Sequence, residues 1–258
     1  MIITPAQAMA FLLILARLVG LFLTAPFFND KRISAWFKMT LLVWVASLLI
    51  FVVPLSTKAP NTPLLLMITI LVEFTIGVIV GFTADLIVVG IRFAGTLMDT
   101  QAGISVASLM DPSTGQNAAL FEQLLKWISL IVFLAIDGHH MVLSALYQSF
   151  FLLPIGSPID FTEGIRYIMT FGKDIFLIGM QLASPIILVV FLVDFGFGVL
   201  NRVAEQINVF NLGFQIKPTV SLFIFLAIIP GLGNALLRIV YQVMDKMLNV
   251  LYLLQLKG

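Results

Sequence analysis

Long apolar stretches, separated by short polar or proline-containing segments, make up most of this chain. A helix that spans a bilayer needs about 20 mainly apolar residues, so several stretches are long enough and the second and fourth are short. The pattern predicts an all-α integral membrane protein built of helical hairpins. The stretches are residues 6–28, 37–53, 64–91, 120–136, 167–200 and 219–240.

Two further segments show weaker apolar patterns. Residues 141–153 are short enough for a re-entrant or buried helix. Residues 242–258 have apolar side chains at helical spacing and polar ones opposite, which predicts an amphipathic terminal helix. Pro185 and Pro230 lie inside apolar stretches and predict kinked helices, because proline removes a backbone hydrogen bond there.

Composition supports the membrane assignment and excludes several function classes. The chain has 258 residues, of which 60% are hydrophobic and 10% are charged, whereas soluble domains are about one quarter charged. A net charge of +1 and the lack of a basic stripe argue against nucleic acid as a partner. Cysteine is absent, which excludes disulfides and thiolate chemistry.

Residues 95–117 form a polar segment rich in small residues between two apolar stretches. A membrane protein keeps long non-helical backbone outside the hydrocarbon, inside protein, or lining an aqueous cavity. Loops of this length are uncommon unless they are functional or disordered. The segment is therefore predicted to be a long polar loop, and an ordinary exposed loop is the alternative.

Charged side chains in the apolar stretches are candidates for function, because such charges are costly in a membrane. Glu73, Gly77, Gly81 and Asp85 recur every four residues along one helix face. Since glycines at this spacing let a neighbouring helix approach closely, we interpret the face as a helix-packing seam with acidic ends. An ion relay is the alternative.

Arg17, Asp174 and Asp194 are the other charges of this kind. Each is a candidate for function, and a buried ion pair or a contact with a partner subunit is the alternative. Twenty residues separate the two aspartates, which puts them on roughly opposite faces of one ideal helix. They are therefore not expected to form a paired-carboxylate site.

The motifs of known catalytic and metal sites are missing. The two histidines, His139 and His140, are adjacent, and neighbouring side chains on a helix point in different directions. We therefore expect a turn between helices there, with no metal site. The chain has no Walker phosphate loop, zinc-protease motif or serine nucleophile elbow. No enzyme activity and no cofactor are predicted.

An ordered set of motifs across essentially the whole chain resembles the FliR family of flagellar type III secretion proteins. The most specific is the run GVLNRVAEQINVFNLGF at residues 198–214. The others, in chain order, are Thr24-Ala25-Pro26, Glu73-x3-Gly77-x3-Gly81-Phe82, Gln101-x-Gly103-x-Ser105, Asp111-Pro112, Gly138-His139 and Pro154-Ile155-Gly156.

The resemblance implies a non-enzymatic, pore-forming subunit of the export gate in the bacterial inner membrane, within the flagellar basal body. It implies a hetero-oligomer with FliP and FliQ, contacts with FlhB, FlhA and membrane lipid, and passage of unfolded flagellar proteins. Residues 1–160 would correspond to a FliP-like part and residues 161–258 to a FliQ-like hairpin. The polar loop would act as the plug of the closed pore.

Residue roles follow from the same resemblance. In the plug, small residues would allow close chain packing, a methionine would seal against water, and a proline–glycine turn would form the tip. The proposed plug residues are Gly103, Ser105, Ser108, Met110, Asp111, Pro112 and Gly115. The polar connection between the last two long helices, residues 201–214, would contact partner subunits through Asn201, Arg202, Glu205 and Gln206.

Two alternatives remain open at this point. The first is an injectisome export-gate subunit of the same family. The second, from a different class, is an ion-coupled secondary transporter that uses Glu73, Asp85 or Asp194. Against the transporter, the two halves of the sequence show no inverted repeat around matched broken helices.

Overall fold

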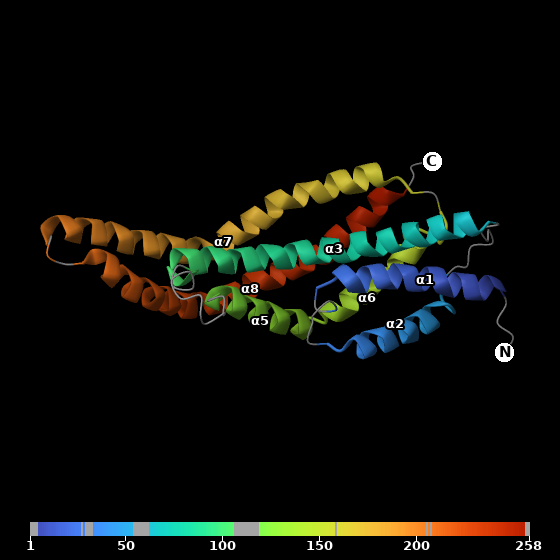
Figure 1. Ribbon diagram of the computed structural model, residues 1–258, viewed down its shortest axis with the longest axis horizontal. Helices are drawn as coiled ribbons and strands as arrows, with labels where there is room; N and C mark the ends of the chain where they lie inside the picture. Colours follow the sequence, from blue (N-terminus) through green and yellow to red (C-terminus); the bar gives the residue numbers. More distant parts are fainter. Residues whose placement is uncertain are drawn as a thin grey trace. The chain divides into compact units, whose positions relative to one another are not determined.

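The protein is all-α, as the sequence predicts. The computed structural model describes residues 5–26, 28, 33–53, 62–105, 119–157, 159–204, 206 and 208–255 (Figure 1). Within these ranges the only β-type pairing is an isolated antiparallel bridge between Ile159 and Gln255. The named helices are α1 (Pro5–Thr24), α2 (Ala35–Leu49), α3 (Pro63–Gln101), α5 (Leu120–Ala135), α6 (Gly138–Leu152), α7 (Phe161–Val203) and α8 (Val209–Leu254).

Four of these helices, α1, α3, α7 and α8, are long and apolar enough to cross a membrane. A fifth span results if α5 and α6 together form one broken span. Helix α2 has 15 residues, which is shorter than a bilayer crossing requires. The architecture is therefore that of an all-α membrane protein.

Polar side chains before several helices explain where those helices begin. Ser34 accepts a hydrogen bond from the Phe37 N–H at 3.3 Å, and Asn208 accepts one from the Asn211 N–H at 3.1 Å. Asp160 accepts from the Thr162 N–H at 2.9 Å, which also lowers the pKa of the Asp160 carboxyl. These contacts satisfy N–H groups that the first turn of a helix leaves unpaired.

Two expected element boundaries are wrong. Residues 95–101 belong to α3, so the polar segment does not begin as loop at residue 95. Helix α8 continues through both 219–240 and the segment expected to be a separate terminal helix from 242, because no breaker lies between them. Pro185 lies inside α7, and Pro218 and Pro230 lie inside α8.

The chain divides into two compact units, each of which combines early and late parts of the sequence. The first contains Met1–Ile87, Asp137–Phe171 and Val240–Gly258, and the second contains Val88–Ile136 and Gly172–Ile239. These units do not coincide with a division at residue 160. The correspondence of residues 1–160 with FliP and of 161–258 with FliQ remains a prediction.

Candidate functional site

The residues identified from the sequence lie in three arrangements. The first unit contains a seam between two helices and a buried ion pair. The second unit contains the helical hairpin together with the end of α3, where the polar segment begins. In the seam, α1 and the first half of α3 run side by side (Figure 1). A Cβ atom added to Gly77 would lie 2.9 Å from the Leu21 nitrogen, and one added to Gly20 would lie 2.8 Å from the Val78 nitrogen. Larger residues at these positions would overlap the backbone of the facing helix.

Gly81 continues the same close approach. A Cβ atom there would lie 2.9 Å from the Ala25 nitrogen. One residue earlier, at the end of α1, Thr24 donates a hydrogen bond from its hydroxyl to the Val78 carbonyl at 3.2 Å. The predicted seam glycines therefore face α1 of the same chain. Any contact of the seam with another subunit remains a prediction.

The seam begins at a buried ion pair between Arg17 and Glu73. Both side chains are at most 1% exposed, and Arg17 Nη2 lies 2.5 Å from Glu73 Oε2. Arg17 Nε donates to the same oxygen at 2.7 Å. Each charge therefore has its counter-ion inside the protein, which is the condition under which buried charges are tolerated.

Further contacts complete the hydrogen bonding of this pair. Arg17 Nη1 donates to the Ser149 carbonyl at 2.9 Å, and Nη2 donates to the Leu153 carbonyl at 2.9 Å. The guanidinium also lies 4.2 Å from the ring centre of Phe150. Glu73 Oε1 accepts from the Gly156 N–H at 3.1 Å, where the backbone has φ +75°. The cluster thus joins α1, α3, α6 and the Pro154–Gly156 segment.

In the second unit, Asp99 fixes the end of α3 to the start of α5. Its side chain is 1% exposed, and its two carboxylate oxygens accept hydrogen bonds from the Phe121 N–H at 2.9 Å and the Glu122 N–H at 3.0 Å. Ala119, the residue before α5, has no side chain able to cap the helix. Asp99 therefore performs this capping from another helix.

Two neighbouring contacts strengthen the same junction. Arg92 pairs with Glu122 at 3.0 Å, and Thr96 donates to Glu122 at 3.4 Å. A Cβ atom on Gly95 would lie 2.6 Å from the Glu122 nitrogen. Gly95 is thus a helical residue whose small size permits close packing against α5, and it does not indicate a loop.

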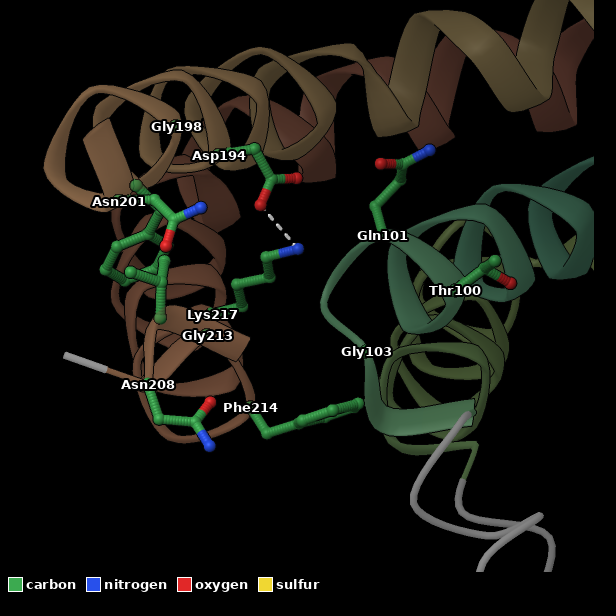
Figure 2. A pocket seen from close by; sticks show the side chains of 12 residues that line it. Thr100, Gln101, Gly103, Asp194, Gly198, Asn201, Asn208, Gly213, Phe214 and Lys217 are labelled. Atoms are coloured by element: carbon green, nitrogen blue, oxygen red, sulfur yellow. Dashed lines mark ion pairs between the residues drawn. The ribbon is translucent and has the colours of Figure 1, made fainter. Parts of the chain in front are cut away.

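The second unit also contains the hairpin formed by the end of α7 and the start of α8. A pocket of about 580 Å³ lies between this hairpin and the end of α3 (Figure 2). Asp194 on α7 and Lys217 on α8 both line this pocket and form an ion pair, with Nζ and Oδ1 2.5 Å apart. Phe214 points toward Gly103, whose φ is +78° and whose added Cβ would lie 3.8 Å from the ring (Figure 2).

The structure shows where the predicted hairpin residues lie. The connection is shorter than the expected 201–214, because α7 continues to Val203 and α8 begins at Val209. Asn201 lines the pocket at the end of α7, and Arg202 and Gln206 are exposed. Glu205 lies outside the described residues.

The polar segment is described only at its beginning. Gly103 and Ser105 follow α3, and Gly103 lines the pocket. The other proposed plug residues, Ser108, Met110, Asp111, Pro112 and Gly115, lie outside the described residues. At the other end of the seam, Asp85 is half-buried on α3, and Asp174 is half-buried on α7.

Sequence reasoning missed the roles of Asp99 and Lys217. A signal for Asp99 was present, because the start of α5 has an alanine where a capping side chain is expected. Lys217 lies next to Pro218, between the expected connection at 201–214 and the last apolar stretch, and nothing local indicates Asp194 as its partner. That pairing follows only from the folding of α7 back on α8.

The fold and these sites define an all-α membrane protein with a helical hairpin, a buried charge pair and a joined end of α3 and start of α5. The chain belongs to the family described as bacterial export proteins, family 1, which matches residues 8–243. This finding confirms the resemblance on which the residue roles were based.

Individual relatives agree with the family. The flagellar biosynthetic protein FliR of Pectobacterium carotovorum subsp. carotovorum is 32% identical over 238 residues, which are 91% of each chain. FliR of Escherichia coli (strain K12) is 28% identical over 219 residues, covering 84% of this chain and 82% of the relative. The Yop proteins translocation protein T of Yersinia pestis is 26% identical over 218 residues, 83% of each.

Proposed function

We propose that this chain is a structural, pore-forming subunit of the flagellar type III protein export gate. It would assemble in the bacterial inner membrane, in the flagellar basal body, with FliP and FliQ and in contact with FlhB and FlhA. Unfolded flagellar proteins would be its transported substrates. The observation that carries the proposal is the family match over residues 8–243, together with relatives named for flagellar biosynthesis and for Yop translocation.

The second part of the proposal is that the polar segment is the plug. A plug must occupy the lumen without loosening the subunit that carries it. The junction of α3 and α5 meets this requirement, because Asp99 and Gly95 hold the two ends of the segment together by contacts that do not involve residues 106–118. A plug carried here would therefore have a base that is held by contacts within the subunit.

This arrangement can be tested by replacing residues 106–116 with a short Gly–Ser linker in chains co-expressed with FliP and FliQ. We expect normal co-purification and a membrane that leaks small molecules, because the base is intact and the stopper is gone. The matched control places the same linker between α2 and α3, at residues 54–61, and should cause no leak. Normal assembly with unchanged permeability would refute the plug role.

The hairpin is proposed to contact partner subunits. Asn201 and Arg202 present polar groups at its exposed end, where they can bind backbone groups of another chain. Substituting either with alanine should reduce co-purification with FliP and FliQ. Lys173→Ala, an equally exposed change on α7, is the matched control and should leave co-purification unchanged. Equal yields from all three variants would contradict the proposal.

The arrangement of charges argues against Glu73 and Asp194, two of the three candidate carboxylates, as coupling sites of an ion-coupled transporter. Both oxygens of Glu73 are engaged, one by Arg17 and one by the Gly156 N–H, and Asp194 is paired with Lys217. A coupling carboxylate must instead exchange its ion during transport. Complementation distinguishes the flagellar from the injectisome system: restored motility in a strain lacking FliR supports the first, and restored effector secretion alone supports the second.

A further inference from the structure

We propose a binding site for a divalent transition-metal cation at the start of α6, formed by Asp137, His139 and His140. Each of these residues offers one metal-binding atom, a carboxylate oxygen or an imidazole nitrogen. These three atoms lie within 4.8 Å of one another. The two imidazole rings lie 4.3 Å apart between centres, so the adjacent histidines do not diverge as their positions in sequence suggest. The contiguous segment Asp-Gly-His-His therefore gathers three metal-binding groups in one place.

The backbone at Asp137 explains this convergence. Asp137 has φ 57° and ψ 34°, the left-handed conformation, which is uncommon for residues other than glycine. Its carbonyl accepts from the His140 N–H at 2.8 Å, while its side chain makes no capping hydrogen bond to α6. The carboxylate instead lies toward the second histidine, with Asp137 Oδ1 3.7 Å from His140 Nδ1.

One nitrogen of the site lacks the partner that a buried polar atom normally has. His139 Nδ1 is buried and has no hydrogen-bond partner within the described part of the chain. Leaving a buried polar atom unpaired costs free energy. A bound cation, or a water molecule on that cation, would satisfy it.

The ligand set selects the class of cation. Two imidazoles and one carboxylate suit Zn²⁺, Ni²⁺ or Cu²⁺, whereas Mg²⁺ and Ca²⁺ prefer oxygen ligands. Around a tetrahedral Zn²⁺ with bonds of about 2.0–2.2 Å, ligand atoms are roughly 3.3 Å apart. The side chains of Asp137 and His140 are 73% and 71% exposed, so rotation about their side-chain bonds can close the remaining distance.

Electrostatics determine how strongly such a site binds. A cation near the N-terminus of a helix is repelled by the partial positive charge of the helix end. The Asp137 carboxylate offsets this repulsion, so its removal should weaken binding as much as the loss of a histidine. Three protein ligands leave the fourth position of the metal for water.

The composition of the chain makes the test specific. His139 and His140 are the only histidines and there is no cysteine, so imidazole or thiolate binding cannot arise elsewhere in the chain. The full chain, purified in detergent with a tag that contains no histidine, is titrated with Zn²⁺ against a chromophoric chelator. We expect one Zn²⁺ per chain, with no competition from Mg²⁺.

Variants separate the site from non-specific binding. His140→Ala and Asp137→Ala should each weaken Zn²⁺ binding about tenfold or more. Glu163→Gln, which removes an exposed carboxylate elsewhere in the same unit, is the matched control and should bind as the unchanged chain does. Absence of saturable Zn²⁺ binding, or equal affinity in His140→Ala, would overturn the proposal.

Two further measurements do not use the chelator titration. Cu²⁺ bound to the unchanged chain should show two nitrogen ligands by electron paramagnetic resonance, and a single nitrogen would contradict the site. Zn²⁺ should raise the unfolding temperature of the unchanged chain, because a ligand that binds the folded state stabilises it, and should not raise that of His140→Ala. An equal rise in both would overturn the proposal.

Discussion

The buried pair of Arg17 and Glu73 allows the sharpest quantitative test of the fold. Removing one partner of a buried ion pair leaves an uncompensated charge and costs about 3–5 kcal/mol. Glu73→Met would leave the guanidinium with hydrogen bonds only to the Ser149 side chain and to the carbonyls of Ser149 and Leu153. Arg17→Met would leave the carboxylate with only the Gly156 N–H.

The double variant is the informative one. With both charges gone, the Ser149 carbonyl still accepts from the Leu153 N–H at 2.9 Å, so part of the lost hydrogen bonding is already satisfied within the fold. We therefore expect the double variant to be about as stable as either single variant. The coupling energy between the two positions is then about 3 kcal/mol or more.

The assay is equilibrium unfolding of the purified full chain in mixed micelles, followed by the fluorescence of its three tryptophans. The matched control is the Arg92–Glu122 pair, whose side chains are 54% and 25% exposed and whose coupling should be below about 1 kcal/mol. If the destabilisations at Arg17 and Glu73 simply add, or if each single change costs less than 1 kcal/mol, the reasoning from buried charge is wrong.

Three other substitutions have distinct expected outcomes in the same unfolding assay. Gly77→Ala should lower the free energy of unfolding by about 1–3 kcal/mol, because the added methyl group pushes α1 and α3 apart. Gly172→Ala is the control and should not destabilise the protein, because an added Cβ there meets nothing within 4 Å. Equal losses from the two changes would contradict the seam. Asp99→Ala should cost about 1–3 kcal/mol because one buried and one part-buried N–H group lose their acceptor. An unchanged stability would show that these groups have another acceptor. Lys217→Met removes the counter-ion of Asp194 and should change the free energy of unfolding by less than about 1 kcal/mol, because Asp194 is 46% exposed to solvent. A larger loss would mean that this ion pair is less accessible to solvent than the structure indicates.

The class of fold could be predicted from the sequence because hydrophobic stretches long enough to span a bilayer have few alternatives to helix. The boundary at residue 95 could not, because small residues are typical both of loops and of helices in close contact. Gly95 belongs to the second group, as its position against the Glu122 backbone shows. Composition alone does not distinguish these two uses of glycine.

Pairing partners were harder to predict than elements. Arg17 and Glu73 were each identified as costly charges, but their contact joins residues 56 positions apart and depends on how α1 meets α3. Glycine spacing indicated that α3 has a close neighbour, without identifying α1. The family resemblance supplied the expected partners in the export gate, and no contact within one chain tests those.

Local backbone geometry was also hard to predict. An ideal helix would separate the side chains of His139 and His140, and the expectation of no metal site rested on that separation. The left-handed residue at Asp137 and the start of α6 bring the rings to 4.3 Å between centres instead. A left-handed conformation at a single residue cannot be predicted from the spacing of hydrophobic residues.

The long separation between Arg17 and its partners also sets an order for synthesis and membrane insertion. At about 5–20 residues per second, Glu73 is made roughly 3–11 s after Arg17, and Ser149 and Leu153 follow later still. During that interval an arginine near the centre of a membrane helix opposes insertion by about 2.5–3.5 kcal/mol. We therefore expect α1 to become firmly inserted only once α3 has been made, and its full set of contacts to wait for α6.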